Sequence, residues 1–203
     1  GGYVLLALLT VQVRQLARQQ GLGLVIDVAP RQRLWIALAL VLLAVQSATG
    51  AWVSTNYAVL ACTEFPKCQG SWWPLMDFAG GFEIWRPLGF DRNGAHISFQ
   101  ALTAIHFTHR LMAVLTLIAL AVLAFLLRNN AGLRKPVRAL AALLVLQLVT
   151  GLSNVVLDWP IVAAVLHTGG AGAMVVVLTW LLMSTRSCVT QTAAVNPTAG
   201  LTL

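Results

Sequence analysis

Residues 101–127 read ALTAIHFTHRLMAVLTLIALAVLAFLL, an apolar segment whose only polar side chains of note lie in its first half. About 20 apolar residues suffice to cross a bilayer, so this segment predicts a transmembrane helix. An imidazole inside hydrocarbon is costly and needs a partner or a function. His109 therefore marks this segment as the place where a functional site begins.

Three further segments are long and apolar enough to span a membrane, at about residues 34–59, 137–157 and 161–185. In lipid each must be helical, because the backbone finds no water to bond. The whole chain of 203 residues is 59% hydrophobic and only 9% charged, whereas soluble domains carry about 25% charged residues. The sequence predicts an all-α membrane protein, with a four-helix bundle over residues 34–186.

Residues 1–13 are apolar but too short to span. A signal peptide would need a basic start and a small-residue cleavage site, and neither is seen. We expect the end of a truncated transmembrane helix, and hence the C-terminal part of a longer protein. A cytoplasmic loop is expected over 14–33, an outer segment over 60–100 and a cytoplasmic tail over 187–203.

Charge placement predicts the orientation. Basic residues gather in the loops that flank the spans on one side, which the positive-inside rule makes cytoplasmic; these are Arg14, Arg18, Arg31, Arg33, Arg128, Arg134, Lys135, Arg138 and Arg186. The net charge of +7 therefore indicates topology and not nucleic-acid binding, since no basic patch or stripe is present. We expect a multi-pass protein of a bacterial inner membrane, with its C-terminus in the cytoplasm and residues 60–100 in the periplasm.

Two histidines lie at similar depth in spans that enter from the same side. At about 1.5 Å per residue, His109 lies ~12 Å and His167 ~9 Å below the outer surface. Two such imidazoles can ligate one haem iron across a bundle. The alternative is that both hydrogen-bond other helices or line a polar cavity. Arg110 could pair with haem propionates, and His106, one turn before His109, could bond a propionate or a ligand imidazole.

A short motif occurs twice. Residues 46–50 read QSATG and residues 147–151 read QLVTG. Each lies in the span that precedes a histidine-bearing span, which suggests a pseudo-two-fold bundle around a central cofactor. Small residues at 169–173 would admit either a close helix or a porphyrin face.

The outer segment contains Cys62 and Cys68. Thiols outside the cytoplasm are oxidised, so a disulfide closing this small loop is expected, as a staple or, less simply, in a redox role. Zinc is disfavoured because no second ligand pair lies nearby. Cys188 is expected to be a free thiol. The stretch GSWWPLMDFAGGFEIW, residues 70–85, reads as an interfacial anchor or as a short helix covering the site.

Three stretches together resemble the C-terminal half of haem A synthases, the CtaA/Cox15 family: CTEFPKCQGSWWP, IHFTHRLMAV and QLVTGLSNVVLDWPIVAAVLHTGGAGA, at residues 62–74, 105–114 and 147–173. The resemblance implies an eight-helix enzyme of two similar four-helix halves. The family oxidises the C8 methyl of haem O to the formyl of haem A for terminal oxidase assembly. The implied surroundings are membrane lipid, haem O synthase, oxidase assembly factors and an unidentified electron donor.

The resemblance also implies roles for single residues. Haem b would lie between His109 and His167 in this half. The substrate haem O would bind in the other half, where a glutamate precedes the first histidine by three residues. His106 takes that place here, so this half is expected to lack the catalytic carboxylate. Two alternatives use the same residues: a non-enzymatic bis-histidine membrane electron carrier of the cytochrome b type, and a scaffold protein in which the histidines are structural.

Overall fold

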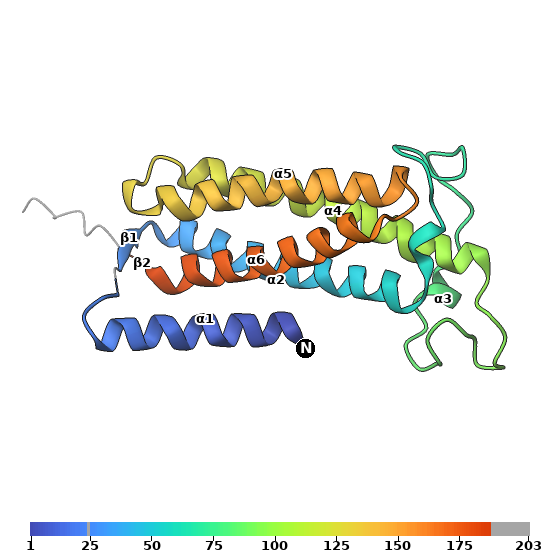
Figure 1. The fold of residues 1–203 in the computed structure, drawn as a ribbon, viewed down its shortest axis with the longest axis horizontal. Helices are drawn as coiled ribbons and strands as arrows, with labels where there is room; N and C mark the ends of the chain where they lie inside the picture. Colours follow the sequence, from blue (N-terminus) through green and yellow to red (C-terminus); the bar gives the residue numbers. More distant parts are fainter. Residues whose placement is uncertain (24, 188–203) are drawn as a thin grey trace, which may run out of the picture.

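The computed structural model describes residues 1–23 and 25–187 and is a bundle of long, nearly antiparallel helices (Figure 1). Cys188 and the expected tail lie outside the described residues. Four helices are long and apolar enough to cross a membrane; they are α2 (Pro30–Thr55), α4 (Phe99–Leu127), α5 (Arg134–Val156) and α6 (Ile161–Ser184). None of these helices contains an aspartate or glutamate. The expected all-α membrane fold is confirmed.

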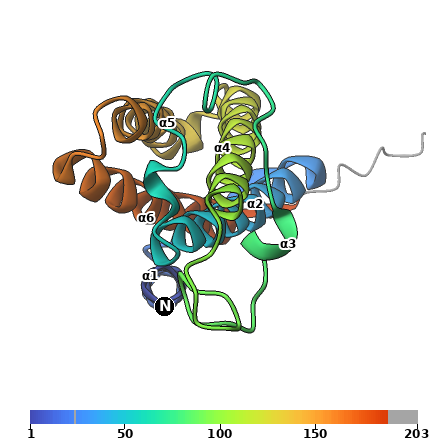
Figure 2. The ribbon, with the colours of Figure 1, turned by 90° about the vertical axis from the view of Figure 1, so that its right-hand side faces the viewer.

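Helix α1 (Gly2–Gln19) lies against α6 at one side of the bundle (Figures 1 and 2). Helix α1 ends at Gln19 and not at residue 13, and α2 begins at Pro30. The segment between the two helices is therefore residues 20–29, which is shorter than the expected loop over 14–33. The guanidinium carbon of Arg14 lies 5.0 Å from the centre of the Trp180 ring. Contacts with α6 therefore extend α1 beyond the apolar stretch that the sequence marks.

Two short strands close the bundle at one end. Strand β1 (Ile26–Val28) pairs in parallel with β2 (Thr185–Ser187). Asp27 and Arg186 face each other in this pairing, and their side chains form an ion pair with an Nε to Oδ1 distance of 2.5 Å. We call this end of the bundle the sheet end.

The opposite end, called the loop end here, carries the long segment between α2 and α4 (Figures 1 and 2). This segment holds a 3-10 turn, η1 (Ala58–Leu60), and a single-turn helix, α3 (Phe78–Gly81). The α5–α6 turn is also here, and both Asp158 and Trp159 in it have positive φ angles. A second 3-10 turn, η2 (Ala131–Leu133), joins α4 to α5 at the sheet end.

The largest hydrophobic core lies in the sheet-end half. All four membrane-length helices contribute to it, with Ile36, Leu120, Leu140 and Leu178 at 1% exposure or less. In the loop-end half the core is smaller and comes from α2, α4 and the loop segment, with Val53 and Ile105 among its buried members. Among the described residues, α5 and α6 add nothing to that second core. We call α2 with α4 one helix pair and α5 with α6 the other. In the loop-end half, these two helix pairs are therefore not joined by a shared apolar core.

Candidate functional site

His109 lies on α4 and is held against α2. Its Nδ1 atom is 2.9 Å from the hydroxyl of Thr49 and 3.1 Å from the amide nitrogen of Gln46. Gly50 leaves room for the ring, since a Cβ there would lie 3.0 Å from His109 Cε1. The motif at 46–50 therefore forms a close seat for this imidazole.

His167 lies on α6 and is held against α5 in the same way. Its Nδ1 atom is 3.1 Å from the hydroxyl of Thr150. A Cβ on Gly151 would lie 3.2 Å from its Cε1 atom. Gln147 donates to the backbone carbonyl of His167 at 2.9 Å. The weak sequence repeat is thus a repeat of contacts, in which each glutamine–threonine–glycine motif seats the histidine of the following helix.

Both seats lie in the loop-end half, where the two helix pairs share no core. His109 and His167 are both partly exposed. Among the described residues, no cluster of three or more His, Cys, Asp or Glu side chains could hold a bare metal ion. Two imidazoles alone suit a metal whose remaining positions are filled by a macrocycle.

His106 lies one turn before His109 and is 6% exposed. Its Nδ1 atom is buried and has no hydrogen-bond partner in the described part of the chain. A buried polar atom without a partner is unfavourable. His106 therefore offers a hydrogen-bonding atom that this chain alone does not use.

Arg110 lies on the loop side of α4 and holds the cysteine loop. Cys62 and Cys68 form a disulfide, as expected from the sequence. The Arg110 guanidinium donates to the carbonyls of Cys62, Glu64 and Lys67, at 2.5, 2.8 and 3.2 Å. Its Nε atom is buried without a partner among the described residues. Pairing of Arg110 with a propionate stays a prediction, because most of its donors bind the loop.

The family model described as a cytochrome oxidase assembly protein, COX15-CtaA, matches residues 1–181. The chain belongs to the COX15-CtaA family. The resemblance noted in its sequence is thereby confirmed at the level of the family.

Two curated relatives of this COX15-CtaA chain carry the name heme A synthase. The one from Shewanella oneidensis is 37% identical over 136 residues, which is 64% of this chain and 39% of the relative. The one from Rhizorhabdus wittichii is 30% identical over 171 residues, or 84% of this chain and 44% of the relative. The chain thus spans less than half the length of these relatives. No solved structure matches.

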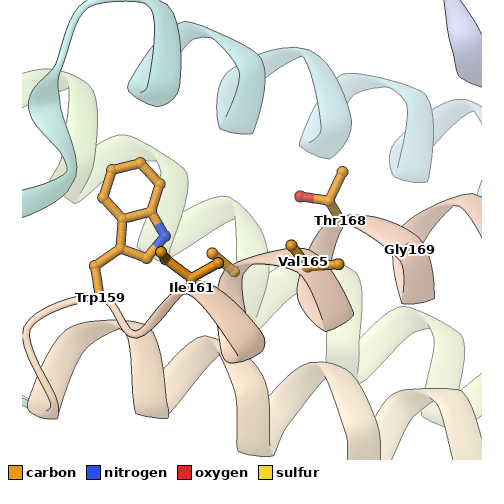
Figure 3. A pocket seen from close by; sticks show the side chains of 6 residues that line it. Trp159, Ile161, Val165, Thr168 and Gly169 are labelled. Atoms are coloured by element: carbon orange, nitrogen blue, oxygen red, sulfur yellow. The ribbon is translucent and has the colours of Figure 1, made fainter.

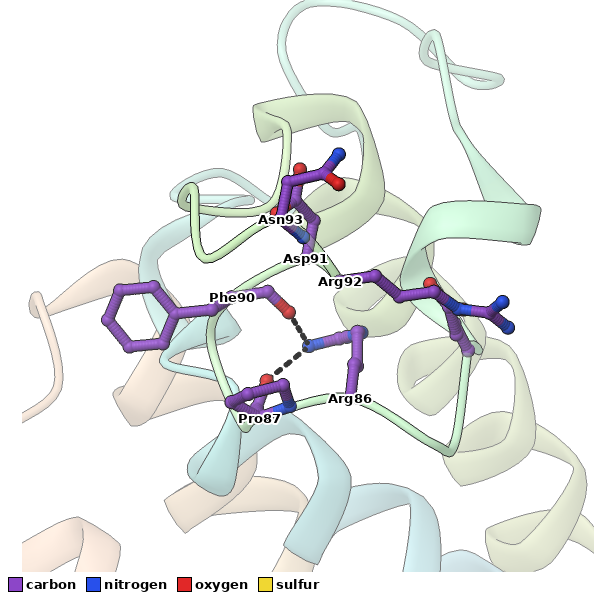
Figure 4. A network of polar contacts seen from close by, with 7 residues as sticks. Arg86, Pro87, Phe90, Asp91, Arg92 and Asn93 are labelled. Carbon is purple, nitrogen blue, oxygen red and sulfur yellow. Dashed lines mark hydrogen bonds and ion pairs between the residues drawn. The ribbon is translucent and has the colours of Figure 1, made fainter.

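The loop segment of this COX15-CtaA chain is also fixed by Arg86, which is buried (Figure 4). Arg86 donates to the carbonyls of Pro87, Phe90 and Gly81. Its guanidinium carbon lies 5.8 Å from the centre of the Trp52 ring, at the end of α2. Sequence reasoning missed Arg86, because backbone carbonyls leave no signal in the sequence that would mark them as its partners.

An open pocket of about 640 Å³ lies on α6 and the turn before it (Figure 3). Its lining comes from a different side of α6 from that of His167, and consists of Trp159, Ile161, Ala164, Val165, Thr168 and Gly169. None of these was expected as a site residue apart from Gly169, which lies in the small-residue stretch. Exposed tryptophans gather at the same end of the bundle, namely Trp72, Trp73 and Trp85.

Proposed function

We propose that this chain is the haem b half of a haem A synthase, and that His109 and His167 are the residues that would hold that haem through its iron. The observation that carries the proposal is the pair of matching histidine seats in a half-bundle without a shared core. A haem held there by two imidazoles would supply one-electron transfer. In this proposal the full-length protein, and not this half alone, oxidises the methyl group of haem O to the formyl group of haem A.

The residues around the two histidines fit such a group. In the loop-end half the buried apolar core comes from α2, α4 and the loop segment, so among the described residues no shared core of all four helices competes with a ligand there. Gly50 and Gly151 keep both rings close against their neighbouring helices. His106 offers its unpartnered Nδ1 atom near the loop end, where a propionate could accept a hydrogen bond if that nitrogen carries the proton. Such a bond would remove the cost of burying that atom.

Arg110 has a different task in this proposal. It holds the disulfide loop to α4 beside His109, through three carbonyls of the loop. A guanidinium is suited to this because its planar donors stay charged and point in fixed directions. Arg110 and the disulfide would thus cover one edge of the site and exclude water from it.

The reacting part lies elsewhere in this proposal. The membrane helices of this chain contain no carboxylate, and the relatives named heme A synthase are more than twice as long as the matched region. We place the substrate haem O and the catalytic acid in the remainder of the protein. We further propose a bacterial inner membrane as the location, with the loop end in the periplasm and the sheet end in the cytoplasm.

The test is the haem spectrum of the full-length protein after His109→Ala or His167→Ala. Each substitution should remove the bis-histidine signature and most of the bound haem. The control is His96→Ala, because His96 lies in the loop segment stacked on Phe90 and on no membrane helix. A spectrum unchanged in both variants would overturn the proposal. Haem bound as expected, with no conversion of haem O, would instead favour a non-enzymatic electron carrier.

A further inference from the structure

Thr49 and Thr150 occupy the same place in the two histidine seats. We propose that they are positioning residues, which hold His109 and His167 in the tautomer protonated at Nδ1. Both Nε2 atoms are then left with a free lone pair for the iron. The inference rests on the proposed haem site for its purpose, but the tautomer itself does not depend on haem.

The hydroxyl protons of both threonines are already in use. Thr49 donates to the carbonyl of Gln46 at 2.8 Å, and Thr150 donates to the carbonyl of Leu146 at 2.7 Å. A hydroxyl has a single proton to donate and can otherwise only accept. The contacts of 2.9 and 3.1 Å to the two Nδ1 atoms are therefore hydrogen bonds only if Nδ1 carries the proton.

The side-chain amide of Gln46 cannot accept the Nδ1 proton through its nitrogen, because an amide nitrogen is a donor. Its nitrogen lies 3.1 Å from His109 Nδ1 and 3.5 Å from His109 Nε2. The two ring nitrogens lie on opposite sides of Cε1, and their lone pairs point apart. An atom this close to both lies over the ring and along neither lone pair. Thr49 is therefore the in-plane partner of His109, as Thr150 is of His167.

The second motif supports this reading. Gln147 donates to the His167 carbonyl at 2.9 Å and has no contact with the ring in the described structure. The contact between a threonine hydroxyl and the imidazole Nδ1 atom is therefore the one that both seats have in common. In each seat a glycine follows the threonine, and its missing Cβ lets the hydroxyl and the ring nitrogen come within bonding distance.

A fixed tautomer matters for ligand strength. Histidines that bind metals usually donate their other N–H to a second group, which orients the ring and raises the basicity of the ligating nitrogen. Loss of such a partner typically lowers metal affinity by about 10- to 100-fold. A threonine hydroxyl is a neutral acceptor, so it orients the ring without adding charge to the membrane interior.

The experiment compares Thr49→Val and Thr150→Val with a matched control in the full-length protein. The control is Thr116→Val, since Thr116 is buried on α4 and donates to the carbonyl of Met112 at 2.7 Å, but has no hydrogen bond with a histidine in the part of the chain that the structure describes. The first readout is the ¹⁵N NMR spectrum of the imidazoles in haem-free protein. Wild type and Thr116→Val should show Nδ1–H for both histidines, and each seat variant should show mixed tautomers at its own histidine.

The second readout is haem affinity, measured by titration with haem b. Each seat variant should bind about 10- to 100-fold more weakly, and Thr49→Ser or Thr150→Ser should restore binding, because serine keeps the acceptor. The inference is overturned if the wild-type histidines are protonated at Nε2, or if the valine variants change neither tautomer nor affinity. A third outcome separates the two proposals. If Nδ1–H is seen in the wild type and lost in the valine variants, but the wild type binds no haem, the tautomer is supported and the proposed function is rejected.

Discussion

The two halves of the bundle are built differently. In the sheet-end half, four membrane-length helices meet in one apolar core, and the paired strands close it. In the loop-end half, the core covers only α2, α4 and the loop segment, and both histidine seats lie there. The difference teaches that the sheet-end half holds the four helices together through a shared apolar core, while the loop-end half, which lacks such a core, is where we propose that a ligand binds.

The largest effect is expected when a leucine of α6 is replaced by alanine in the sheet-end half, compared with the same substitution in the loop-end half. Leu178→Ala removes a fully buried side chain from the shared core, and should cost about 2–5 kcal/mol of unfolding free energy. Leu166→Ala, on the same helix in the loop-end half, removes a side chain that is 47% exposed and should cost far less. Unfolding of the haem-free protein in mixed micelles measures both; equal losses would contradict the comparison.

Addition of haem should strengthen the loop-end half. A ligand at 100 times its dissociation constant stabilises the folded state by about 2.7 kcal/mol. Hydrogen exchange should slow most in α5 and α6 around residues 147–170, and little around the sheet-end core. Equal protection of both halves, or protection of the sheet end alone, would place the ligand elsewhere.

Much of the fold could be predicted from the sequence, because hydrophobic length alone limits a membrane helix. The segment at 101–127 becomes α4, Phe99–Leu127, and the segment at 161–185 becomes α6, Ile161–Ser184. The extension of α1 to Gln19 could not be predicted in this way. Its last turns are held by contacts with α6, including a hydrogen bond from Arg18 to the carbonyl of Met183, and the local sequence carries no trace of them.

The candidate site, too, has parts that could be predicted from the sequence and parts that could not. The two histidines and the repeated motif can be recognised in the sequence itself, so they could be predicted as parts of one site. The geometry that joins them could not, because it depends on which face of α2 meets α4 and which face of α5 meets α6. Arg110 shows the limit most clearly, since its partners are the carbonyls of Cys62, Glu64 and Lys67, and every residue has a carbonyl.

Removing the disulfide should affect the loop end alone. Cys62→Ala with Cys68→Ala frees a loop that the bond closes over a separation of 6 residues, and such a closure contributes about 2 kcal/mol in the chain-entropy description. Faster amide exchange is expected at residues 61–71, with unchanged exchange at the sheet end. Cys188→Ala, a cysteine substitution outside this loop, serves as the control. Faster exchange throughout the bundle would show that the two ends are coupled.

The smallest effect is expected at the strand pair. The Arg186 guanidinium beside Asp27 lowers the pKa of that carboxyl below its usual value. A lowered folded-state pKa stabilises the folded protein above the usual carboxyl value, and this contribution disappears as the pH falls through the lowered value. Asp27→Asn should therefore slightly reduce stability at neutral pH and flatten its dependence below about pH 4. An unchanged pH profile would show that the exposed pair contributes nothing.

The distribution of tryptophans gives this molecule an optical asymmetry. Trp52, Trp72, Trp73, Trp85 and Trp159 lie at the loop end, while Trp35 and Trp180 lie toward the sheet end. Intrinsic fluorescence therefore reports mainly on one end without any added dye. Because a porphyrin absorbs where indoles emit, arrival of haem between the seats would quench that emission, and the arrival could be followed in real time in an unlabelled membrane.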